Sequence, residues 1–303
     1  MAEIQIGNNS LTKAVIRSAN GHTAEIYTHG AHVTSWKTPN GEENLLFYSK
    51  EAIFNPPTAI RGGVPICWPQ FSDLGPCKTQ HGFARNSEFS IINSSTNSVT
   101  MELRNEGAEN KTPGFSPPTD FPQKFILTCK VSLDQDGVLH QELVVQNPST
   151  ATDTLKFTCA LHTYFTLRNG IRNAAVENLK GCRYLDSLQG RMECVEAEEK
   201  VKFPGEVDKI YLGVPDTLKI LDGGAEKGEK PEEAVVAGFK IEKTAFSDAV
   251  VWNPHAAKAA KMADFGNDEW EQMVCVEVAQ AGSGAIELEP GKQWAGWQKL
   301  SLL

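Results

Sequence analysis

The chain has 303 residues, of which 40% are hydrophobic and 22% are charged, and its formal net charge is −9. This length and composition allow one large β domain or two ordinary domains with a well-formed core. The acidic balance argues against nucleic acid or a membrane surface as a partner, because both favour basic patches. A small anionic ligand stays compatible with it, since two converging arginines can reverse the sign of the charge locally.

The cysteines and the N-terminal residues bear on the cellular compartment. Seven cysteines are scattered along the chain without a CxxC pair, which is typical of reduced intracellular thiols, although a disulfide between Cys67 and Cys77 is left open. The first residues lack the basic and apolar regions of a secretory signal. No run of 18 apolar residues predicts a membrane span. We therefore expect a cytoplasmic protein.

Short segments with alternating apolar residues dominate the chain, and they are rich in Val, Ile, Thr and aromatic residues. Asp136-Gly137, between two of them, predicts a hairpin. Many short strands at regular spacing indicate an all-β (mainly β) fold, either a sandwich or a barrel. The expected strands are Thr23–Tyr27, Ala31–Trp36, Glu88–Ile92, Ser98–Leu103, Phe125–Leu133, Leu139–Val145, Leu155–Phe165, Leu218–Leu221, Phe239–Lys243, Ala249–Trp252, Met273–Ala279, Ala285–Leu288 and Gln293–Leu300.

Helix is expected at one place. Asn253 can cap it, Pro254 suits its first position, and Gly266 ends it after the sequence HAAKAAKMADF. Asn105–Asp120 predicts a long loop, and Gly223–Glu233 predicts a charged, mobile one. Neither a repeat nor a domain boundary stands out, so we predict a single domain over residues 1–303.

Two loop segments concentrate hydrogen-bond donors. Arg61–Phe71 (RGGVPICWPQF) is followed nine residues later by Gln80–Arg85 (QHGFAR). The planar guanidinium fork suits phosphate oxygens, so these segments predict a phosphate or polyol pocket. Alternatively, Arg61, Gln80, His81 and Arg85 form a network that only pins loops. The adjacent glycines are not a P-loop, because no GK[ST] follows them.

Two expected strands carry an acid–base candidate each. Alternation in LKFTCALHTYF turns His162 away from a mostly apolar face, towards a cavity or solvent; a structural histidine is the alternative. In MVCVEVAQ, Glu277 lies in an apolar strand, where a carboxylate is costly unless it is hydrogen-bonded, paired or open to a ligand cavity. A buried ion pair or an edge-strand charge would explain Glu277 equally well.

Other polar residues carry weaker signals. Asp208, in GEVDKIY, can accept hydrogen bonds from sugar hydroxyls or can be an ordinary surface carboxylate. His22, His29 and His32 lack metal-site spacing with Cys or acidic partners, so we expect no metal.

Five motifs in order identify a family. RGGVPICWPQF, QHGFAR, ALHTYF, SDAVVWNP and CVEVAQ together resemble the aldose 1-epimerase (galactose mutarotase) superfamily, and most of all its glucose-6-phosphate 1-epimerase branch. The resemblance runs from about Ala31 to Trp297. It implies a single-domain, galactose mutarotase-like β-supersandwich of antiparallel strands, with a sugar cleft on its concave face.

The resemblance also implies roles for individual residues. His162 matches the general acid and Glu277 the general base of anomer interconversion, a reaction that needs no metal or cofactor. Substrate-binding positions match Arg61, Gln80, Arg85 and Asp208, with His81 as a supporting active-site histidine and Asp248 of SDAVVWNP in a supporting role.

The implied function is interconversion of the α and β anomers of glucose 6-phosphate or a related hexose 6-phosphate, by a monomer or weak homo-oligomer. Two alternatives stay open: a mutarotase of unphosphorylated aldoses, and a non-catalytic sugar-phosphate-binding protein. A glycoside hydrolase is less favoured, because it usually needs two catalytic carboxylates, and Glu277 is the one candidate here.

Overall fold

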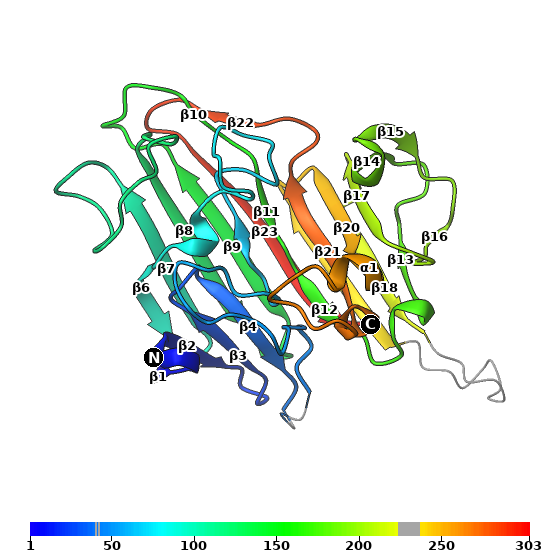
Figure 1. The fold of residues 1–303 in the computed structure, drawn as a ribbon. Coiled ribbons are helices and arrows are strands. Elements are labelled where there is room, and N and C mark those ends of the chain that lie inside the picture. Colours follow the sequence, from blue (N-terminus) through cyan, green and yellow to red (C-terminus); the bar gives the residue numbers. More distant parts are fainter. Residues whose placement is uncertain (40, 42, 224–236) are drawn as a thin grey trace.

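The computed structural model describes residues 1–39, 41, 43–223 and 237–303. These residues form mostly antiparallel strands with little helix, arranged as two large sheets and two small ones (Figure 1). The predicted mainly β fold is confirmed. Among the described residues, no helix has the length and apolar character needed to cross a membrane.

The larger sheet contains strands in which buried and less buried residues alternate, as in β7 (Ser98–Asn105), β8 (Phe125–Leu133) and β9 (Leu139–Gln146). This period of two places one row of side chains in the core. Asp136-Gly137 lies in the predicted hairpin turn between β8 and β9, with Gly137 at φ +81°. The sheet order is β16 (Lys200–Val201), β13 (Ala174–Glu177), β18 (Thr217–Asp222), β19 (Ala237–Thr244), β23 (Gln293–Leu302), β9, β8, β7 and β6 (Ser90–Ser95).

The second large sheet is buried most completely at its centre. Its order is β15 (Met192–Val195), β14 (Arg183–Asp186), β17 (Val207–Leu212), β20 (Asp248–Asn253), β21 (Met273–Gln280), β11 (Cys159–Leu161) and β5 (Ile66–Cys67), and β12 (Tyr164–Thr166) also pairs with β21. All residues of β20 are buried, and so are all but the last residue of β21. Little of either face of these central strands is therefore exposed to bulk solvent.

Smaller elements complete the fold. The four-stranded sheet contains β1 (Glu3–Ile6), β2 (Thr12–Arg17), β3 (Thr23–Tyr27) and β4 (His32–Lys37), and β10 (Leu155–Phe157) pairs with β22 (Ile286–Leu288). Short 3-10 helices are η1 (Asn8–Ser10), η2 (Ala84–Asn86), η3 (Ile171–Asn173), η4 (Ser187–Gln189) and η5 (Glu269–Gln272).

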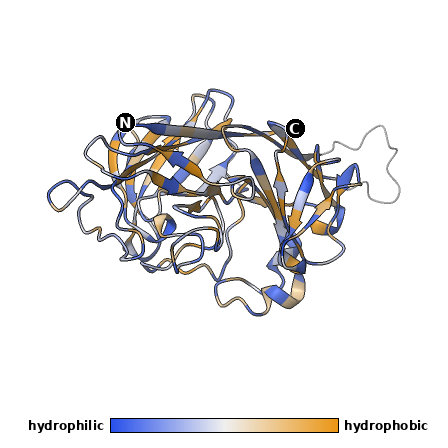
Figure 2. Cartoon of the chain, turned by 90° about the horizontal axis from the view of Figure 1, so that it is seen from above, coloured by the Kyte–Doolittle hydropathy of each residue, from blue (hydrophilic) through white to orange (hydrophobic). Residues whose placement is uncertain are grey.

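A buried polar chain joins the two large sheets. The Thr163 hydroxyl, between β11 and β12, lies 3.2 Å from Gln298 Oε1 on β23, and Gln298 Nε2 donates to Gln141 Oε1 on β9 at 3.1 Å. Most of the core is apolar, and Figure 2 shows hydrophobic segments concentrated in the strands while the outer loops are mainly hydrophilic. These paired groups satisfy one another, which removes most of the cost of burying them.

Trp68 anchors the donor-rich loops in the core. Its ring is fully buried, with the Phe125 centroid at 4.6 Å and the Phe83 centroid at 5.5 Å. Both Trp68 and Phe83 therefore act in packing, and they hold the loops on which Arg61 and Arg85 lie.

The predicted strand Leu155–Phe165 is wrong as a single element, because the structure divides it into β10, β11 and β12. The amides of Thr158 and His162 donate to the carbonyls of Pro69 and Pro65, at 3.0 Å each. Those two prolines have no backbone N–H that could donate a hydrogen bond to the segment 155–165, so the ladder of hydrogen bonds is interrupted at both places. β10 then leaves the sheet and pairs with β22.

The predicted helix is correct at its start and too long. Asn253 Oδ1 accepts from the His255 amide at 2.9 Å, but the residue itself belongs to β20, and α1 covers only His255–Ala259. The following residues turn inward, because they bury Phe265 against Phe47 and bring Asp264 to Arg61. Tertiary contacts therefore override the helical pattern of this segment.

Other expectations had mixed outcomes. No strand was predicted where β1, β2, β5 and β13 to β17 lie, since these strands are short or largely exposed on one face. Asn105–Asp120 is largely loop, as expected, while residues 224–233 of the predicted charged loop lie outside the described residues. All seven cysteines are free, so the open alternative of a Cys67–Cys77 disulfide is wrong.

The burial of His32 leads us to expect that the protein becomes less stable as the pH decreases. It is fully buried on β4, with Nε2 2.7 Å from the Gly62 carbonyl, and burial lowers its pKa to about 3. Below about pH 6.5 the unfolded chain takes up a proton that the folded chain does not. The unfolding free energy should therefore fall as the pH decreases towards 3, by up to about 1.4 kcal/mol per pH unit from this residue.

Denaturant unfolding between pH 4.5 and 7 tests this expectation. His32→Gln should reduce the slope of unfolding free energy against pH, whereas the same replacement of the partly exposed His22 serves as the control. An unchanged slope in His32→Gln would show that the histidine is not buried in its neutral form.

Candidate active site

The register of β21 brings His162 and Glu277 together. Leu161 on β11 faces Val278, and Tyr164 on β12 faces Cys275, so one continuous register places His162 beside Glu277. His162 Nδ1 lies 3.3 Å from Glu277 Oε1, and the side chains are only 8% and 1% exposed. The two acid–base candidates predicted from separate motifs are thus neighbours on one face of the sheet.

The same face continues across β20 and β17 and forms the floor of a cavity of about 480 Å³. Val250 faces both Glu277 and Ile210, and Trp252 faces Asp208 on the next row. This volume is within the range of small-molecule sites. The cavity is lined by Arg61, Phe71, Ser72, Gln80, His81, Arg85, His162, Ser187, Gly190, Arg191, Asp208, Ile210, Val250, Trp252, Lys258, Met262 and Glu277.

Aromatic rings fix the orientation of the His162 imidazole. The Tyr164 ring stacks on it with centroids 4.7 Å apart and an interplanar angle of 12°, and Trp252 meets it edge-on at 6.0 Å. These contacts leave the imidazole few alternative rotamers and shield it from bulk water. The site is therefore preorganised for proton transfer at a defined position.

Arg61 is held firmly at the cavity wall. Its Nε donates to Asp264 Oδ2 and its Nη1 to the Tyr164 hydroxyl, both at 3.1 Å. The two following glycines are required, because a Cβ on Gly62 would lie 2.2 Å from the backbone of Tyr48, and a Cβ on Gly63 would lie 2.2 Å from the backbone of Val33. Arg61 thus has its charge compensated by a carboxylate that sequence reasoning missed.

His81 is set in one tautomer. Its Nδ1 accepts a hydrogen bond from the Ser72 amide at 3.1 Å, so the neutral ring carries its proton on Nε2. The ring centroid lies 5.6 Å from that of His162, and burial with the nearby Arg85 charge lowers its pKa well below the usual range. His81 can therefore donate one hydrogen bond to a ligand without itself becoming charged.

Arg85 differs from Arg61 in having no carboxylate partner within the described part of the chain. Its Nη2 donates to the Gln80 carbonyl at 3.0 Å, and its Nε is buried without a hydrogen-bond partner. The charge of Arg85 is the largest after burial among the effects that lower the His162 pKa, followed by that of Arg61. The cavity thus contains an uncompensated positive charge close to His162.

Burial favours the neutral form of both members of the acid–base pair. Burial lowers the pKa of His162 well below its usual range and raises that of Glu277 well above its own, with Asp208 adding to the latter shift. The single proton of the pair therefore resides on Glu277. His162 Nδ1 and Glu277 Oε2 are both fully buried without a hydrogen-bond partner, although Nδ1 lies 3.3 Å from Glu277 Oε1.

Asp248 stands apart from the other predicted site residues. Its carboxylate accepts from the amides of Gly213, Ala281 and Ser283 and from the Ser283 hydroxyl, and it is not among the cavity-lining residues. It holds the loop that follows β21. The remaining predicted residues, His162, Glu277, Arg61, Gln80, His81, Arg85 and Asp208, all line the one cavity.

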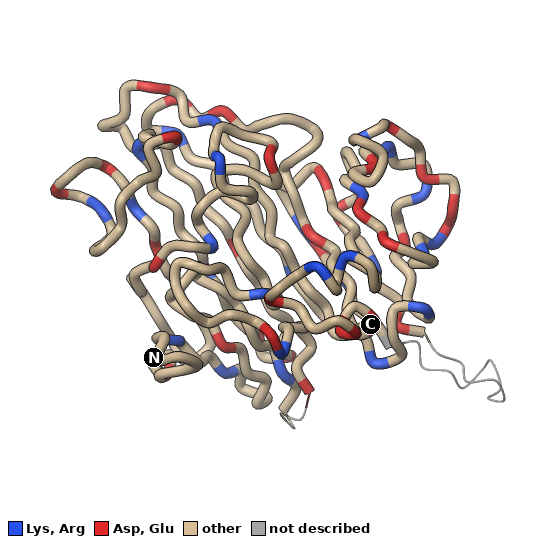
Figure 3. The backbone as a smooth tube through the Cα atoms, viewed as in Figure 1, with Lys and Arg blue, Asp and Glu red and all other residues tan. Residues whose placement is uncertain are grey.

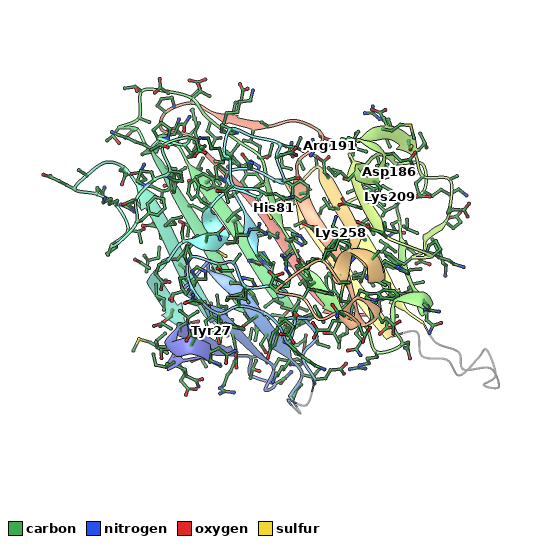
Figure 4. The ribbon with its side chains drawn as sticks, in the orientation of Figure 1. Tyr27, His81, Asp186, Arg191, Lys209 and Lys258 are labelled. Carbon is green, nitrogen blue, oxygen red and sulfur yellow. The ribbon has the colours of Figure 1, made fainter. Side chains whose placement is uncertain are left out.

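Sequence reasoning missed several residues of the wall. Arg191 and Lys258 bring further cations to it, and Asp264 pairs with Arg61. None of them lies in a distinctive local motif, and the segment of Asp264 was expected to be helical. Figure 4 shows His81, Arg191 and Lys258 on different sides of the concave face.

Metal coordination has no candidate among the described residues, where no three His, Cys, Asp or Glu side chains cluster suitably. The early histidines instead hold the loop before Arg61. His29 Nε2 lies 2.8 Å from the Thr58 carbonyl, and His32 contacts the Gly62 carbonyl.

Comparison with known proteins adds an independent line of evidence. The family model described as aldose 1-epimerase matches residues 12–301. A protein from Cenchrus ciliaris, provisionally named glucose-6-phosphate 1-epimerase, is 39% identical over 301 residues, which cover 99% of this chain and 87% of that protein. A protein with the same provisional name from Escherichia coli (strain K12) is 31% identical, with coverage of 85% and 80%.

Solved structures agree with this match. The crystal structure of YeaD from Salmonella typhimurium, provisionally named a mutarotase, is similar with a TM-score of 0.78 and 26% sequence identity. The similarity covers 99% of this chain and 93% of that one.

The raised pKa of Glu277 leads us to expect that this residue lowers the unfolding free energy as the pH increases. Because its folded-state pKa is raised, the folded chain keeps a proton that the unfolded chain loses above about pH 4.5, and the unfolding free energy falls as the pH rises. Each unit by which the pKa is raised corresponds to about 1.4 kcal/mol. Glu277→Gln should therefore gain melting temperature relative to the unmodified protein as the pH increases from 5 to 8.

Thermal unfolding of both proteins over this pH range tests the assignment. The surface replacement Glu287→Gln, on β22, serves as the control and should show no such trend. A difference in melting temperature that does not depend on pH would contradict a protonated Glu277.

Proposed function

The chain belongs to the aldose 1-epimerase family, and from this premise we propose that it interconverts the α and β anomers of glucose 6-phosphate or a related hexose 6-phosphate. The observation that carries the proposal is the buried His162–Glu277 pair, with Nδ1 and Oε1 3.3 Å apart, beside the uncompensated Arg85. Acid–base chemistry at a hemiacetal needs such a pair, and a phosphate needs such a cation.

The reaction proceeds by opening and reclosing the sugar ring. Glu277 removes the proton of the C1 hydroxyl while His162 donates a proton to the ring oxygen, O5. The C1–O5 bond breaks, and C1 becomes an aldehyde that rotates about the C1–C2 bond. The ring recloses on the other face with both proton transfers reversed, so that each residue ends in its starting state.

The chemistry of the sugar fits the position of the arginines. C6 branches from C5, the carbon bonded to the ring oxygen O5, so a phosphate on C6 lies at the edge of the ring that contains O5. Arg85 and Arg61 both act electrostatically on His162, the proposed proton donor to O5. A phosphate held by Arg85 with help from Arg61 therefore leaves C1 and O5 within reach of the acid–base pair, while Asp208 and Gln80 can bind ring hydroxyls.

Substrate binding also explains how the pair becomes active. Catalysis needs an ionised Glu277 and a protonated His162, which carry the same total number of protons as the neutral pair. The phosphate dianion offsets the Arg85 and Arg61 charges that lower the His162 pKa. Arg85 also lowers the Glu277 pKa, whereas Arg61 is among the causes for His162 alone, so a phosphate that offsets both arginines favours transfer of the proton from Glu277 to His162.

The structure favours this reaction over the two alternatives. A protein that only binds sugar phosphates has no need to bury an acid and a base 3.3 Å apart. A mutarotase of unphosphorylated aldoses has no need for an uncompensated arginine. We propose a monomer or weak homo-oligomer that acts in the cytoplasm, where the free cysteines stay reduced.

Replacement of the base tests the mechanism. Glu277→Gln should keep the fold and lower the rate of anomer exchange of glucose 6-phosphate by about 10²–10⁴-fold, because a general base typically contributes this much. Exchange NMR measures the rate above that of spontaneous mutarotation, and Glu287→Gln is the matched control. Near-normal exchange in Glu277→Gln would remove Glu277 from the mechanism.

Replacement of Arg85 tests the substrate class. Arg85→Gln should lower kcat/KM for glucose 6-phosphate by roughly 10–100-fold, the usual value of a hydrogen bond to a charged group. Unphosphorylated glucose should be much less affected. Arg172→Gln, which removes an exposed arginine elsewhere, controls for net charge. An equal loss on both sugars would mean that Arg85 does not bind the phosphate.

A further inference from the structure

An ion pair connects the two edges of the active-site sheet across the cavity. Arg191 lies in the hairpin between β14 and β15, at one edge, and Asp73 lies in the loop after β5, at the other. The Arg191 guanidinium nevertheless hydrogen-bonds the Asp73 carboxylate, and Arg191 lines the cavity. The side chain therefore extends over the concave face rather than away from it (Figure 4).

The backbone at Arg191 is tightly held. Gly190 and Arg191 both have φ +64°, and the Arg191 amide donates to the Asp186 carbonyl at 2.7 Å. The Asp186 carboxylate accepts from the Leu188 amide and from Gln189 Nε2. A non-glycine residue in this left-handed conformation is uncommon and costs free energy. Here it orients Arg191 towards the cavity.

The ion pair itself is weakly held. The Asp73 side chain is 70% exposed and that of Arg191 is 34% exposed. Pairs of this exposure contribute little to stability, because water solvates both charges almost as well. Release of Asp73 to solvent is therefore easy, and Arg191 can change partner without disturbing the fold.

The charge balance of the cavity calls for a second free cation. A phosphate monoester carries between one and a half and two negative charges at neutral pH. Arg85 supplies one uncompensated charge, whereas Arg61 is bonded to Asp264. Lys258, also on the wall, pairs with Glu206, whose side chain is only 28% exposed and so is less readily released. Among the paired cations of the cavity wall, Arg191 is the one whose carboxylate partner, Asp73, can be released to solvent at the lowest free-energy cost.

We propose that Arg191 is a phosphate-recognition residue that Asp73 holds over the empty cavity and that the substrate phosphate takes over from Asp73. This inference rests on the proposed function, whose substrate class it deepens. The guanidinium exchanges one carboxylate for a phosphate that offers more acceptor oxygens in a more enclosed place, and charge-assisted bonds are stronger there. Discrimination against unphosphorylated sugars then depends on Arg191 as well as on Arg85.

Four variants separate this role from alternatives. Arg191→Gln removes the cation, Asp73→Asn breaks the ion pair but keeps the cation, and Arg191→Lys keeps the charge without the planar fork. Arg183→Gln, in the same hairpin and paired with exposed Glu193, is the matched control. Each is assayed for kcat/KM on glucose 6-phosphate and glucose, and for inhibition by inorganic phosphate, with melting temperature as a check of folding.

Arg191→Gln should lower kcat/KM for glucose 6-phosphate by roughly 10–100-fold and weaken phosphate inhibition similarly, with glucose nearly unaffected and Arg191→Lys in between. Asp73→Asn should retain or increase both kcat/KM for glucose 6-phosphate and the inhibition by inorganic phosphate. Equal losses in Arg191→Gln and Asp73→Asn would show that the pair acts only by closing the cavity, and would overturn the proposal. Identical behaviour of Arg191→Gln and Arg183→Gln would overturn it as well.

The same data distinguish failure of this inference from failure of the proposed function. If the unmodified protein does not exchange glucose 6-phosphate anomers, the proposed function is wrong, while binding of inorganic phosphate, followed by calorimetry, still tests Arg191. If exchange is fast and Arg191→Gln behaves like the control, only the role of Arg191 is wrong.

Discussion

The proposed function of this protein depends on one constraint, which is that a carboxyl group and an imidazole are buried side by side on adjacent strands. The register of β21 against β11 and β12 sets their separation at 3.3 Å, and stacking with Tyr164 fixes the imidazole. Both groups keep an atom without a partner, although burial of such atoms is costly. The surrounding β core supplies the stability that offsets this cost.

The second organising feature is the distribution of charge around this pair. The protein is acidic overall, and Figure 3 shows Lys and Arg segments interspersed with Asp and Glu segments. Most cations at the cavity wall have a carboxylate partner, as Arg61 has Asp264 and Arg191 has Asp73. Arg85 lacks one among the described residues, so the proposed selectivity for a phosphorylated sugar depends on where carboxylates are missing rather than on net charge.

Local patterns predicted much of the fold because strand residues alternate with a period of two. β3 and β8 have the predicted bounds, and most other predicted strands differ from the observed ones by one or two residues. The errors lie where distant parts of the chain intervene. Proline carbonyls interrupt Leu155–Phe165, and the burial of Phe265 ends α1 early. Neither contact is visible in the segment that it reshapes.

Local motifs were enough to identify the chemical types of the predicted site, since His162, Glu277, Arg61, Arg85 and Asp208 were each found in their own motifs and all line one cavity. The electrostatic state of His162 and Glu277 follows only from the folded chain, because their pKa values depend on burial and on charges brought in from other strands and loops. The folded chain also places Asp248 on backbone amides outside the cavity, and it brings Arg191 to the cavity from the edge of the sheet. Residue identity is local, whereas proximity, burial and charge compensation are properties of the folded chain.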